Sequence, residues 1–238
     1  MPFLKFIDRC EKEDIMASTA NGVTVLTELL RCRGWEVEKY QGTVDSNVLE
    51  EADVIIVAYP TESFSGDEIE AMLKFVNEGG GIFLVGEWGN VHENADTLNT
   101  IAHNFSIAFN GDRICDPTYY IRKGLKGKVF DVPVFNLRPH AITEGVKSFR
   151  IVSACSLTAP YDNIIAWGSQ ESFSDLDFDS ELDAFETGQY VPVFAVATYG
   201  NGRVAAVGDL SWLSNEYIIN MGNAQLALNT LSWLIKRL

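Results

Sequence analysis

The sequence has no long hydrophobic run and comparatively few basic residues. Its apolar stretches, such as Val54 to Tyr59, are far shorter than the about 20 residues of a membrane-spanning helix. The N-terminal segment carries no apolar leader of the kind that directs secretion. The 18 Lys and Arg residues stand against 33 Asp and Glu, giving a formal net charge of −15. Because this charge repels phosphate groups, we expect no nucleic-acid partner, and the short apolar runs predict no membrane insertion.

Motifs for disulfide, zinc and serine chemistry are also missing. The four cysteines form no CxxC pair, and we expect them to remain reduced in the cytoplasm. They are Cys10, Cys32, Cys115 and Cys155. The three histidines show no HxH, HxxxH or HExxH spacing, so a zinc site has little support. The G-x-S-x-G signature of a serine nucleophile is absent.

Apolar strands alternate with amphipathic helices over the first 90 residues. Strands are predicted at 3–8, 35–40, 52–60 and 81–86, with a helix at 19–33. A second helix begins at the capping box Ser65 to Glu68 and ends at the three glycines that begin at Gly79. This alternation predicts right-handed βαβ units, a parallel sheet and the α/β class.

The remainder of the chain is less regular. A short helix is predicted at 96–103, an irregular insertion with short strands or loops at 110–139, and strands at 148–154 and 163–168. Residues 190–209 read as an antiparallel hairpin that turns at Asn201-Gly202. An amphipathic helix is predicted at 223–238. With no repeat or linker in the sequence, we expect a single domain over residues 1–238.

Two polar segments follow buried strands, where α/β sheets bind ligands. The first is the turn after strand 81–86, with Glu87 at its expected tip, and the second begins at Asp209. We predict that Glu87, Trp88, Asp209 and Asn215 converge at one cleft. The full set of candidate ligand-binding residues is Glu87, Trp88, His92, Asp209, Trp212 and Asn215. Local roles compete with this prediction, because acids and Asn often cap turns and Trp is often core.

An acidic stretch matches part of a calcium-loop pattern. Carboxylates stand at positions 1, 3, 5, 9 and 12 of the pattern, namely Asp175, Asp177, Asp179, Asp183 and Glu186. Position 6 is Ser180, where the sharp turn favours glycine, and the flanks do not read as paired helices. We therefore expect weak or no calcium affinity, and a solvated acidic loop with no resident cofactor.

Three stretches taken together carry a family resemblance. They are "ADVIIVAYPTESFSGDEIEAMLKFVNEGGGIFLVGE", "HAITEGV", and "GNGRVAAVGDLSWLSNEYI" followed by "NAQLALNTLSWL". In order and spacing they resemble the class I glutamine-amidotransferase-like superfamily. The nearest branch is the domain shared by gliding-motility ABC-transporter accessory proteins and an intraflagellar-transport subunit. The resemblance implies a flavodoxin-like fold, with helices on both faces of a mostly parallel sheet, and a non-catalytic domain linked to carbohydrate or protein binding.

The turn itself argues against amidotransferase chemistry. True members place a cysteine there, because a thiolate attacks the amide carbon, whereas this chain offers Val85-Gly86-Glu87-Trp88-Gly89. We therefore expect no glutaminase activity. The first hypothesis is a catalytically silent domain that binds a small polar ligand, such as a carbohydrate, or a protein partner. The alternatives are a sugar hydrolase using Glu87 and Asp209, and an inert scaffold. Monomer and homo-oligomer both remain open.

Overall fold

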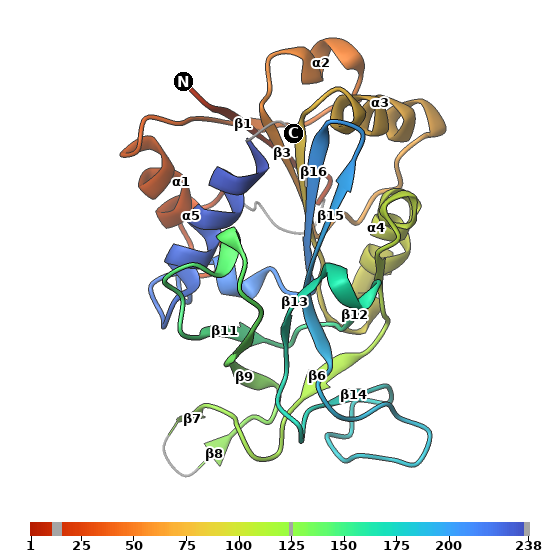
Figure 1. The fold of residues 1–238 in the computed structure, drawn as a ribbon, viewed down its shortest axis with the longest axis vertical. Helices are drawn as coiled ribbons and strands as arrows, with labels where there is room; N and C mark the ends of the chain where they lie inside the picture. Colours follow the sequence, from red (N-terminus) through yellow and green to blue (C-terminus); the bar gives the residue numbers. More distant parts are fainter. Residues whose placement is uncertain (11–15, 124–125, 236–238) are drawn as a thin grey trace.

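One large sheet organises the molecule. The computed structural model describes residues 1–10, 16–123 and 126–235. Eight strands lie in the order β10-β13-β15-β16-β4-β3-β1-β2 (Figure 1). Their bounds are β1 Phe3–Ile7, β2 Glu36–Tyr40, β3 Val54–Ala58, β4 Gly81–Val85, β10 Asn136–Leu137, β13 Ile164–Trp167, β15 Pro192–Tyr199 and β16 Gly202–Val207. The pairs β2-β1, β1-β3, β3-β4 and β4-β16 are parallel, so the predicted mostly parallel α/β fold is confirmed.

Helices cover both faces of this sheet. The helices are α1 Thr24–Arg31, α2 Ser46–Glu50, α3 Gly66–Asn77, α4 Asn94–Ala102 and α5 Asn223–Leu234. Leu26 of α1 and Leu231 of α5 pack with Phe83 of β4 in one core cluster. Met72 of α3 and Leu98 of α4 join the opposite cluster. Figure 1 accordingly shows α1 and α5 on one side of the sheet and α2, α3 and α4 on the other.

Local sequence accounts for the best-defined elements. All five residues of β3 and all five of β4 are buried, as expected for parallel strands that are covered on both faces. Ser65 and Glu68 form the predicted reciprocal capping box at the start of α3. The last three residues of the helix predicted at 223–238 lie outside the described residues.

The hairpin is present, but its turn differs by one position from the prediction. Tyr199 pairs with Gly202, so the connecting residues are Gly200 and Asn201. Gly200 adopts a φ of 57°, which glycine reaches without steric cost. Strand β15 runs antiparallel to its neighbours, whereas β16 is parallel to β4, with Val207 opposite Val85. The segments after β4 and β16 therefore leave the sheet at the same carboxyl edge.

Small two-stranded sheets extend the molecule beyond this carboxyl edge (Figure 1). The range 110–139 contributes strands to several sheets, so it is woven into the fold instead of forming one separate insertion. The pairs are β6 with β14, β9 with β11, β5 with β12, and β7 with β8. Their bounds are β5 Ala108–Phe109, β6 Arg113–Cys115, β7 Arg122–Lys123, β8 Lys126–Gly127, β9 Asp131–Val134, β11 Phe149–Val152, β12 Leu157–Thr158 and β14 Phe173–Asp175. Short 3-10 segments are η1 Trp88–Glu93, η2 His103–Phe105, η3 Ala141–Thr143, η4 Tyr161–Asn163 and η5 Ser211–Leu213.

Candidate functional site

A pocket of about 270 Å³ opens at the carboxyl edge of the sheet. Its lining comes from the ends of β3, β4 and β11, from the loop after β16, and from the segment before α1. The lining residues are Asn21, Tyr59, Glu87, Trp88, Val91, Val152, Ser153, Leu210, Ser211 and Ser214. The structure therefore brings Glu87 and Trp88 together with the loop that follows Asp209. We call this site the edge pocket.

Glu87 begins the loop that forms one wall of the edge pocket. The sequence predicted Glu87 at the tip of the turn, but its backbone is extended, with a φ of −149°, so Glu87 precedes the turn. The left-handed residues follow it, at Gly89, Asn90, His92 and Glu93. The Glu87 carboxylate accepts a hydrogen bond from the Trp88 amide at 3.2 Å, and the Glu87 amide donates to Asn94 Oδ1 at 3.0 Å. Glu87 is thus both a local cap and a half-buried lining residue.

Asp209 lies beneath the pocket and does not line it. The residue is 0% exposed. Its Oδ2 accepts a hydrogen bond from the Val152 amide at 2.7 Å, and its Oδ1 accepts one from the Ser211 amide at 2.6 Å. Both of these neighbours line the edge pocket. Asp209 therefore positions two walls of the pocket, and its predicted contact with ligand is corrected to a supporting role.

The buried carboxyl of Asp209 predicts a pH effect on stability. Burial raises the pKa of Asp209 from 3.8 to about 7, although its backbone hydrogen bonds act in the opposite direction. Because the folded-state pKa exceeds the unfolded one, the stabilising contribution is complete below the unfolded pKa and is lost as the pH rises through the folded pKa. We expect the free energy of unfolding of Asp209→Asn, relative to that of wild type, to increase as the pH rises from about 5 to about 8.

Urea unfolding across that pH range measures this effect. Asp162→Asn, at an exposed aspartate, is the matched control and should show a difference that is flat with pH. A flat difference for Asp209→Asn as well would contradict the raised pKa.

The other candidates divide between the pocket and the core. The side chain of Trp212 is 0% exposed and packs against the rings of Phe83, Phe149 and Phe194. It cannot stack on a ligand, so this prediction is wrong. The aromatic ring of His92 lies 6.3 Å from that of Tyr59, which places it beside the pocket and outside its lining.

Asn215 holds the start of α1 in place. Its Oδ1 accepts from the Val25 amide at 2.8 Å, while its Nδ2 donates to Thr19 O at 2.7 Å and to Thr24 Oγ1 at 2.9 Å. This satisfies an amide at the helix N-terminus that has no intrahelical partner. The predicted ligand contact of Asn215 is thus replaced by backbone capping, which also fixes the segment that brings Asn21 to the pocket.

Cys155 lies next to the carboxyl edge of the sheet, although it is far from Glu87 in the sequence. A Cβ placed on Gly208 would stand 1.9 Å from Cys155 O and 2.9 Å from its Sγ, so glycine is required for this close approach. Cys155 is 0% exposed. Burial, followed by the negative charges of Asp112, Glu87 and Asp209, raises the pKa of the Cys155 thiol well above its usual value. A buried thiol held neutral in this way is not a nucleophile.

Among the lining residues that the sequence argument did not select, two have an unusual backbone. Tyr59 and Ser153 have left-handed backbones, with φ values of 45° and 57°, which non-glycine residues adopt at a cost. Tyr59 directly follows the buried strand β3, just as Glu87 follows β4 after one glycine, so the strand-end criterion applied to Glu87 would have found it. Ser153 follows β11, whose antiparallel pairing with β9 gave no such signal.

The acidic loop begins at a buried ion pair. Asp175 lies directly opposite Arg113 in the β6-β14 ladder, and Arg113 Nη2 stands 2.5 Å from Asp175 Oδ2. The guanidinium also donates to Phe178 O at 2.9 Å and to Ser180 Oγ at 3.1 Å. It lies 5.6 Å from the ring centre of Trp88. Arg113, which the sequence analysis did not select, therefore joins the acidic loop to the wall of the edge pocket.

The carboxylates of the acidic loop gather in two overlapping groups. One group consists of Asp175, Asp177 and Glu186, and the other of Asp177, Asp179 and Asp183. Local desolvation, together with the charges of Asp179, Asp177 and Glu186, raises the pKa of Asp183. All five residues selected from the calcium-loop pattern thus lie within one connected cluster, and Asp175 is its buried member.

Comparison with known proteins places this chain in a family. A sequence model of the IFT52 GIFT domain matches residues 6–136, which is more than half of the chain. The chain belongs to the IFT52 GIFT domain family. The relation to intraflagellar-transport proteins that the three sequence stretches predicted is thereby confirmed. Membership of the wider amidotransferase-like superfamily remains a resemblance.

Individual relatives show how far the similarity extends. The GIFT domain is 26% identical over 104 residues to human "Intraflagellar transport protein 52 homolog", a match that covers 43% of this chain and 23% of the human protein. The chain therefore spans less than a quarter of that relative. An uncharacterised protein of Aquifex aeolicus is 25% identical over 196 residues, with 79% of this chain and 77% of that protein covered.

A solved structure supports the fold along the whole chain. The "mmIFT52 N-terminal domain" superposes with a TM-score of 0.77 at 19% identity, covering 98% of this chain and 97% of that one. The similarity shows that the GIFT fold extends through β15, β16 and α5, beyond the residues matched by the family model. Among the described residues, none of the helices has the length and apolar character needed to cross a bilayer.

Proposed function

We propose that this GIFT domain is a non-catalytic binding module whose edge pocket holds a small, uncharged, hydroxyl-rich ligand such as a sugar. The observation that carries the proposal is the lining: Glu87, Trp88, Ser153 and Ser211 border one cavity of about 270 Å³. An aromatic face packs against the apolar side of a sugar ring, while carboxylate and hydroxyl groups bond to its hydroxyls.

The charges of the lining residues indicate which class of ligand the edge pocket can bind. Among the described lining residues there is no Lys or Arg, and the ionisable acid is Glu87. A phosphate or carboxylate ligand would meet a negative charge with no cation to balance it, which is unfavourable. A neutral polyol meets no such penalty.

Two buried groups argue against the hydrolase alternative. A glycosidase of the two-carboxylate type needs both acids to flank the scissile bond. Asp209 is 0% exposed and accepts hydrogen bonds on both oxygens, so Glu87 has no second carboxylate facing it in the described lining. The neutral, buried Cys155 thiol likewise offers no nucleophile for acyl transfer.

Backbone strain at the rim supports a binding role. Tyr59 and Ser153 hold left-handed conformations where they line the edge pocket, and such conformations cost about 1–3 kcal/mol each. Strained residues of this kind cluster at functional sites because the surrounding structure must be built to maintain them.

Calorimetric titration with a panel of neutral mono- and disaccharides tests the proposal. For any sugar that binds, we expect Trp88→Ala and Glu87→Gln each to weaken affinity by about tenfold or more, because stacking and charge-assisted hydrogen bonds contribute about 1–3 kcal/mol each. Trp167→Ala, at a half-buried tryptophan of β13 outside the pocket, should bind as wild type.

Two results would contradict this assignment. One is a panel in which no sugar binds. The other is a sugar that binds Trp88→Ala and Glu87→Gln with wild-type affinity, which would place the ligand elsewhere on the domain.

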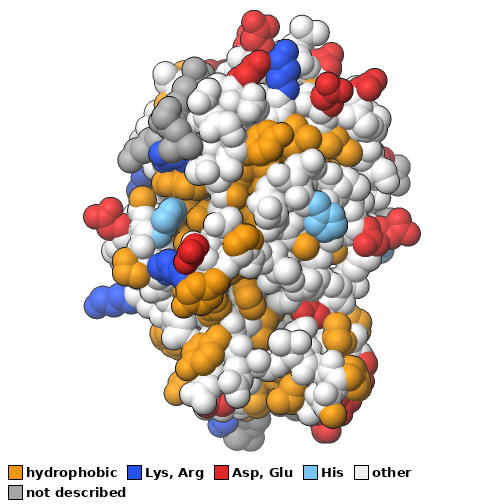
Figure 2. Space-filling view, turned by 45° about the vertical axis from the view of Figure 1, so that its right-hand side comes forward, with side chains coloured by type: hydrophobic (Ala, Val, Ile, Leu, Met, Phe, Trp, Pro, Cys, Tyr) orange, Lys and Arg blue, Asp and Glu red, His pale blue; other side chains and the backbone are white. Residues whose placement is uncertain are grey.

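A protein partner is the second candidate. Tyr161 is 73% exposed and its ring lies 5.9 Å from that of Trp167, with the Arg138 guanidinium over both rings. Tyr, Trp and Arg are the residues enriched at the energetic centres of protein interfaces. Figure 2 shows that hydrophobic side chains reach the surface in several patches over one face. The name of the human relative, an intraflagellar transport protein, also favours a partner.

We further infer that the chain works in the cytoplasm or another reducing compartment. All four cysteines are free thiols, and disulfides form and persist mainly in oxidising compartments.

A further inference from the structure

The acidic loop contains a buried carboxylate oxygen with no protein donor. Asp175 is 0% exposed. Its Oδ2 accepts hydrogen bonds from Arg113 at 2.5 Å and from the Cys115 thiol at 3.3 Å, whereas Oδ1 has no hydrogen-bond partner among the described residues. Buried polar atoms of this kind normally have a partner, and a bound ion or water is one of the recognised explanations for an exception.

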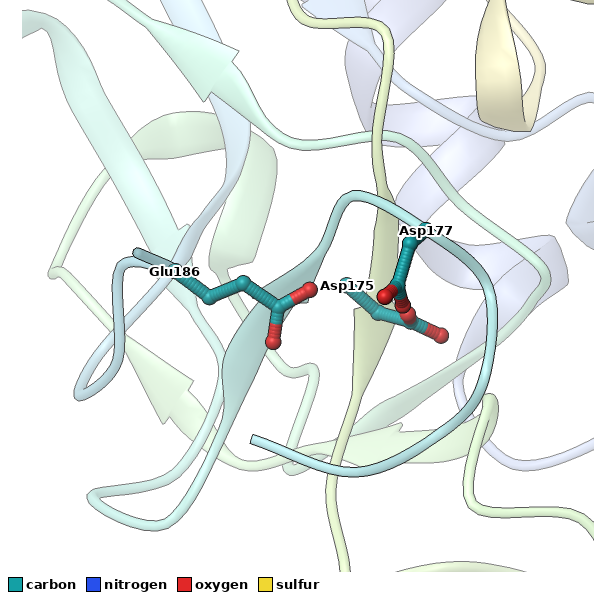
Figure 3. Close-up of side chains that lie close together, drawn as sticks. All are labelled: Asp175, Asp177 and Glu186. Atoms are coloured by element: carbon teal, nitrogen blue, oxygen red, sulfur yellow. The ribbon is translucent and has the colours of Figure 1, made fainter. Parts of the chain in front are cut away.

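Two further carboxylates approach Asp175 from the loop itself. Ligand oxygens of Asp175, Asp177 and Glu186 lie within 4.8 Å of one another. Figure 3 shows the Asp175 and Asp177 carboxylates side by side, with the Glu186 carboxylate directed toward them from the returning part of the loop. Three carboxylates lie this close together, and one of them has a buried oxygen without a donor, so the group can hold a cation.

The backbone is already shaped for such a site. Both Glu186 oxygens accept amide hydrogen bonds, Oε1 from Leu176 at 2.7 Å and Oε2 from Asp183 at 3.0 Å, which fix this carboxylate in place. Ser180, the residue that argued against calcium because glycine was expected there, adopts a φ of 71°. The left-handed conformation at this position is therefore made by serine, at the steric cost that non-glycine residues carry there.

The charge balance leaves room for a divalent ion. The group carries three negative charges, on Asp175, Asp177 and Glu186. The structure records an ion pair for this group between Arg113 and Asp175. Calcium binds oxygen ligands at about 2.3–2.6 Å and tolerates irregular geometry, so opposed ligands stand about 5 Å apart. Magnesium requires near-ideal octahedral geometry at about 2.0–2.1 Å. A site on a loop that is largely exposed suits calcium better, because calcium tolerates irregular geometry.

We propose that Asp175, Asp177 and Glu186 form a calcium-binding site that closes the acidic loop, independently of any ligand in the edge pocket. Calcium would bridge the buried end of the loop at Asp175 to its returning end at Glu186, and water would complete the coordination sphere.

Thermal unfolding of the full chain tests the proposal, first after treatment with EDTA and then with added CaCl₂ or MgCl₂. At a hundredfold excess over its dissociation constant, calcium should raise the unfolding midpoint by about 5–10 °C, with magnesium giving a much smaller shift. Calorimetric titration should give one calcium per chain.

Exposed members of the cluster provide the diagnostic variants. Asp177→Asn combined with Glu186→Gln should abolish the calcium shift, while Glu144→Gln, at an exposed glutamate remote in sequence from the loop, should retain it. Asp177 is exposed and Glu186 half-buried, so this variant tests the cation site without removing the Arg113–Asp175 pair.

Three outcomes would overturn the inference: no calcium binding up to millimolar concentration, an equal response to magnesium, or a shift that persists in the double variant. The sugar titration of the edge pocket uses different residues, so either proposal can fail while the other stands.

Discussion

Replacing Trp212 with alanine is expected to lower the free energy of unfolding by about 3–5 kcal/mol. The indole is 0% exposed, and its ring centre lies 6.4 Å from that of Phe83, 6.0 Å from that of Phe149 and 6.3 Å from that of Phe194. Truncation would remove this aromatic packing and leave a cavity that its neighbours can only partly fill. Urea unfolding measures the loss.

Trp212→Phe is the matched variant. It keeps an aromatic ring in the cluster and removes the indole Nε1, a buried donor without a partner among the described residues. Since an unsatisfied buried donor is itself costly, we expect Trp212→Phe to lose less than half as much stability as Trp212→Ala. An alanine variant as stable as wild type would refute the core role and return Trp212 to the candidate ligand contacts.

Arg113→Met is expected to cost about 3–5 kcal/mol, because it leaves the buried Asp175 carboxylate without its cation. The Arg113 side chain is 9% exposed and that of Asp175 is 0% exposed, so water cannot readily replace the lost partner. The change also removes the hydrogen bonds to Phe178 O and Ser180 Oγ. Chemical unfolding would detect the loss of stability, and proteolysis the release of the acidic loop.

An exposed ion pair supplies the control. Arg31 and Glu28 are also joined, at 2.8 Å, but both side chains are largely exposed, and such pairs contribute little. Arg31→Met should therefore be nearly neutral. The combination Arg113→Met with Asp175→Leu should recover much of the lost stability, because it removes the unpaired charge together with its partner. Equal losses for Arg113→Met and Arg31→Met would contradict the buried-pair argument.

The parts of the fold that follow from local sequence were predictable. Strands β3 and β4 are continuous apolar runs, and the Ser65–Glu68 capping box marks the start of α3. The hairpin sequence does not indicate whether β15 or β16 pairs with the parallel strands. The placement of β16 next to β4 could therefore not be predicted from the hairpin alone. The register of Val207 opposite Val85 is a contact between residues far apart in the chain.

The site was harder to predict than the fold for the same reason. Glu87 and Trp88 were found because they follow a buried strand, a local signal. Trp212 looked like a ligand contact because it lies in a polar loop, yet that loop turns its indole inward onto Phe149 and Phe194. Arg113 was missed because its partner Asp175 is 62 residues away, and the short strands that bring them together carry no clear periodic pattern.

The strand order has a consequence for how this chain can be divided. The family model ends at residue 136, before β16, which pairs with β4 along Arg203 to Val207. A fragment cut at that boundary would expose the backbone edge of Gly81 to Val85 and uncover Phe83, which packs in one cluster with α5. An exposed apolar strand edge of this kind promotes aggregation. Residues 6–136 are therefore not a unit of folding, and an expression fragment must extend through α5.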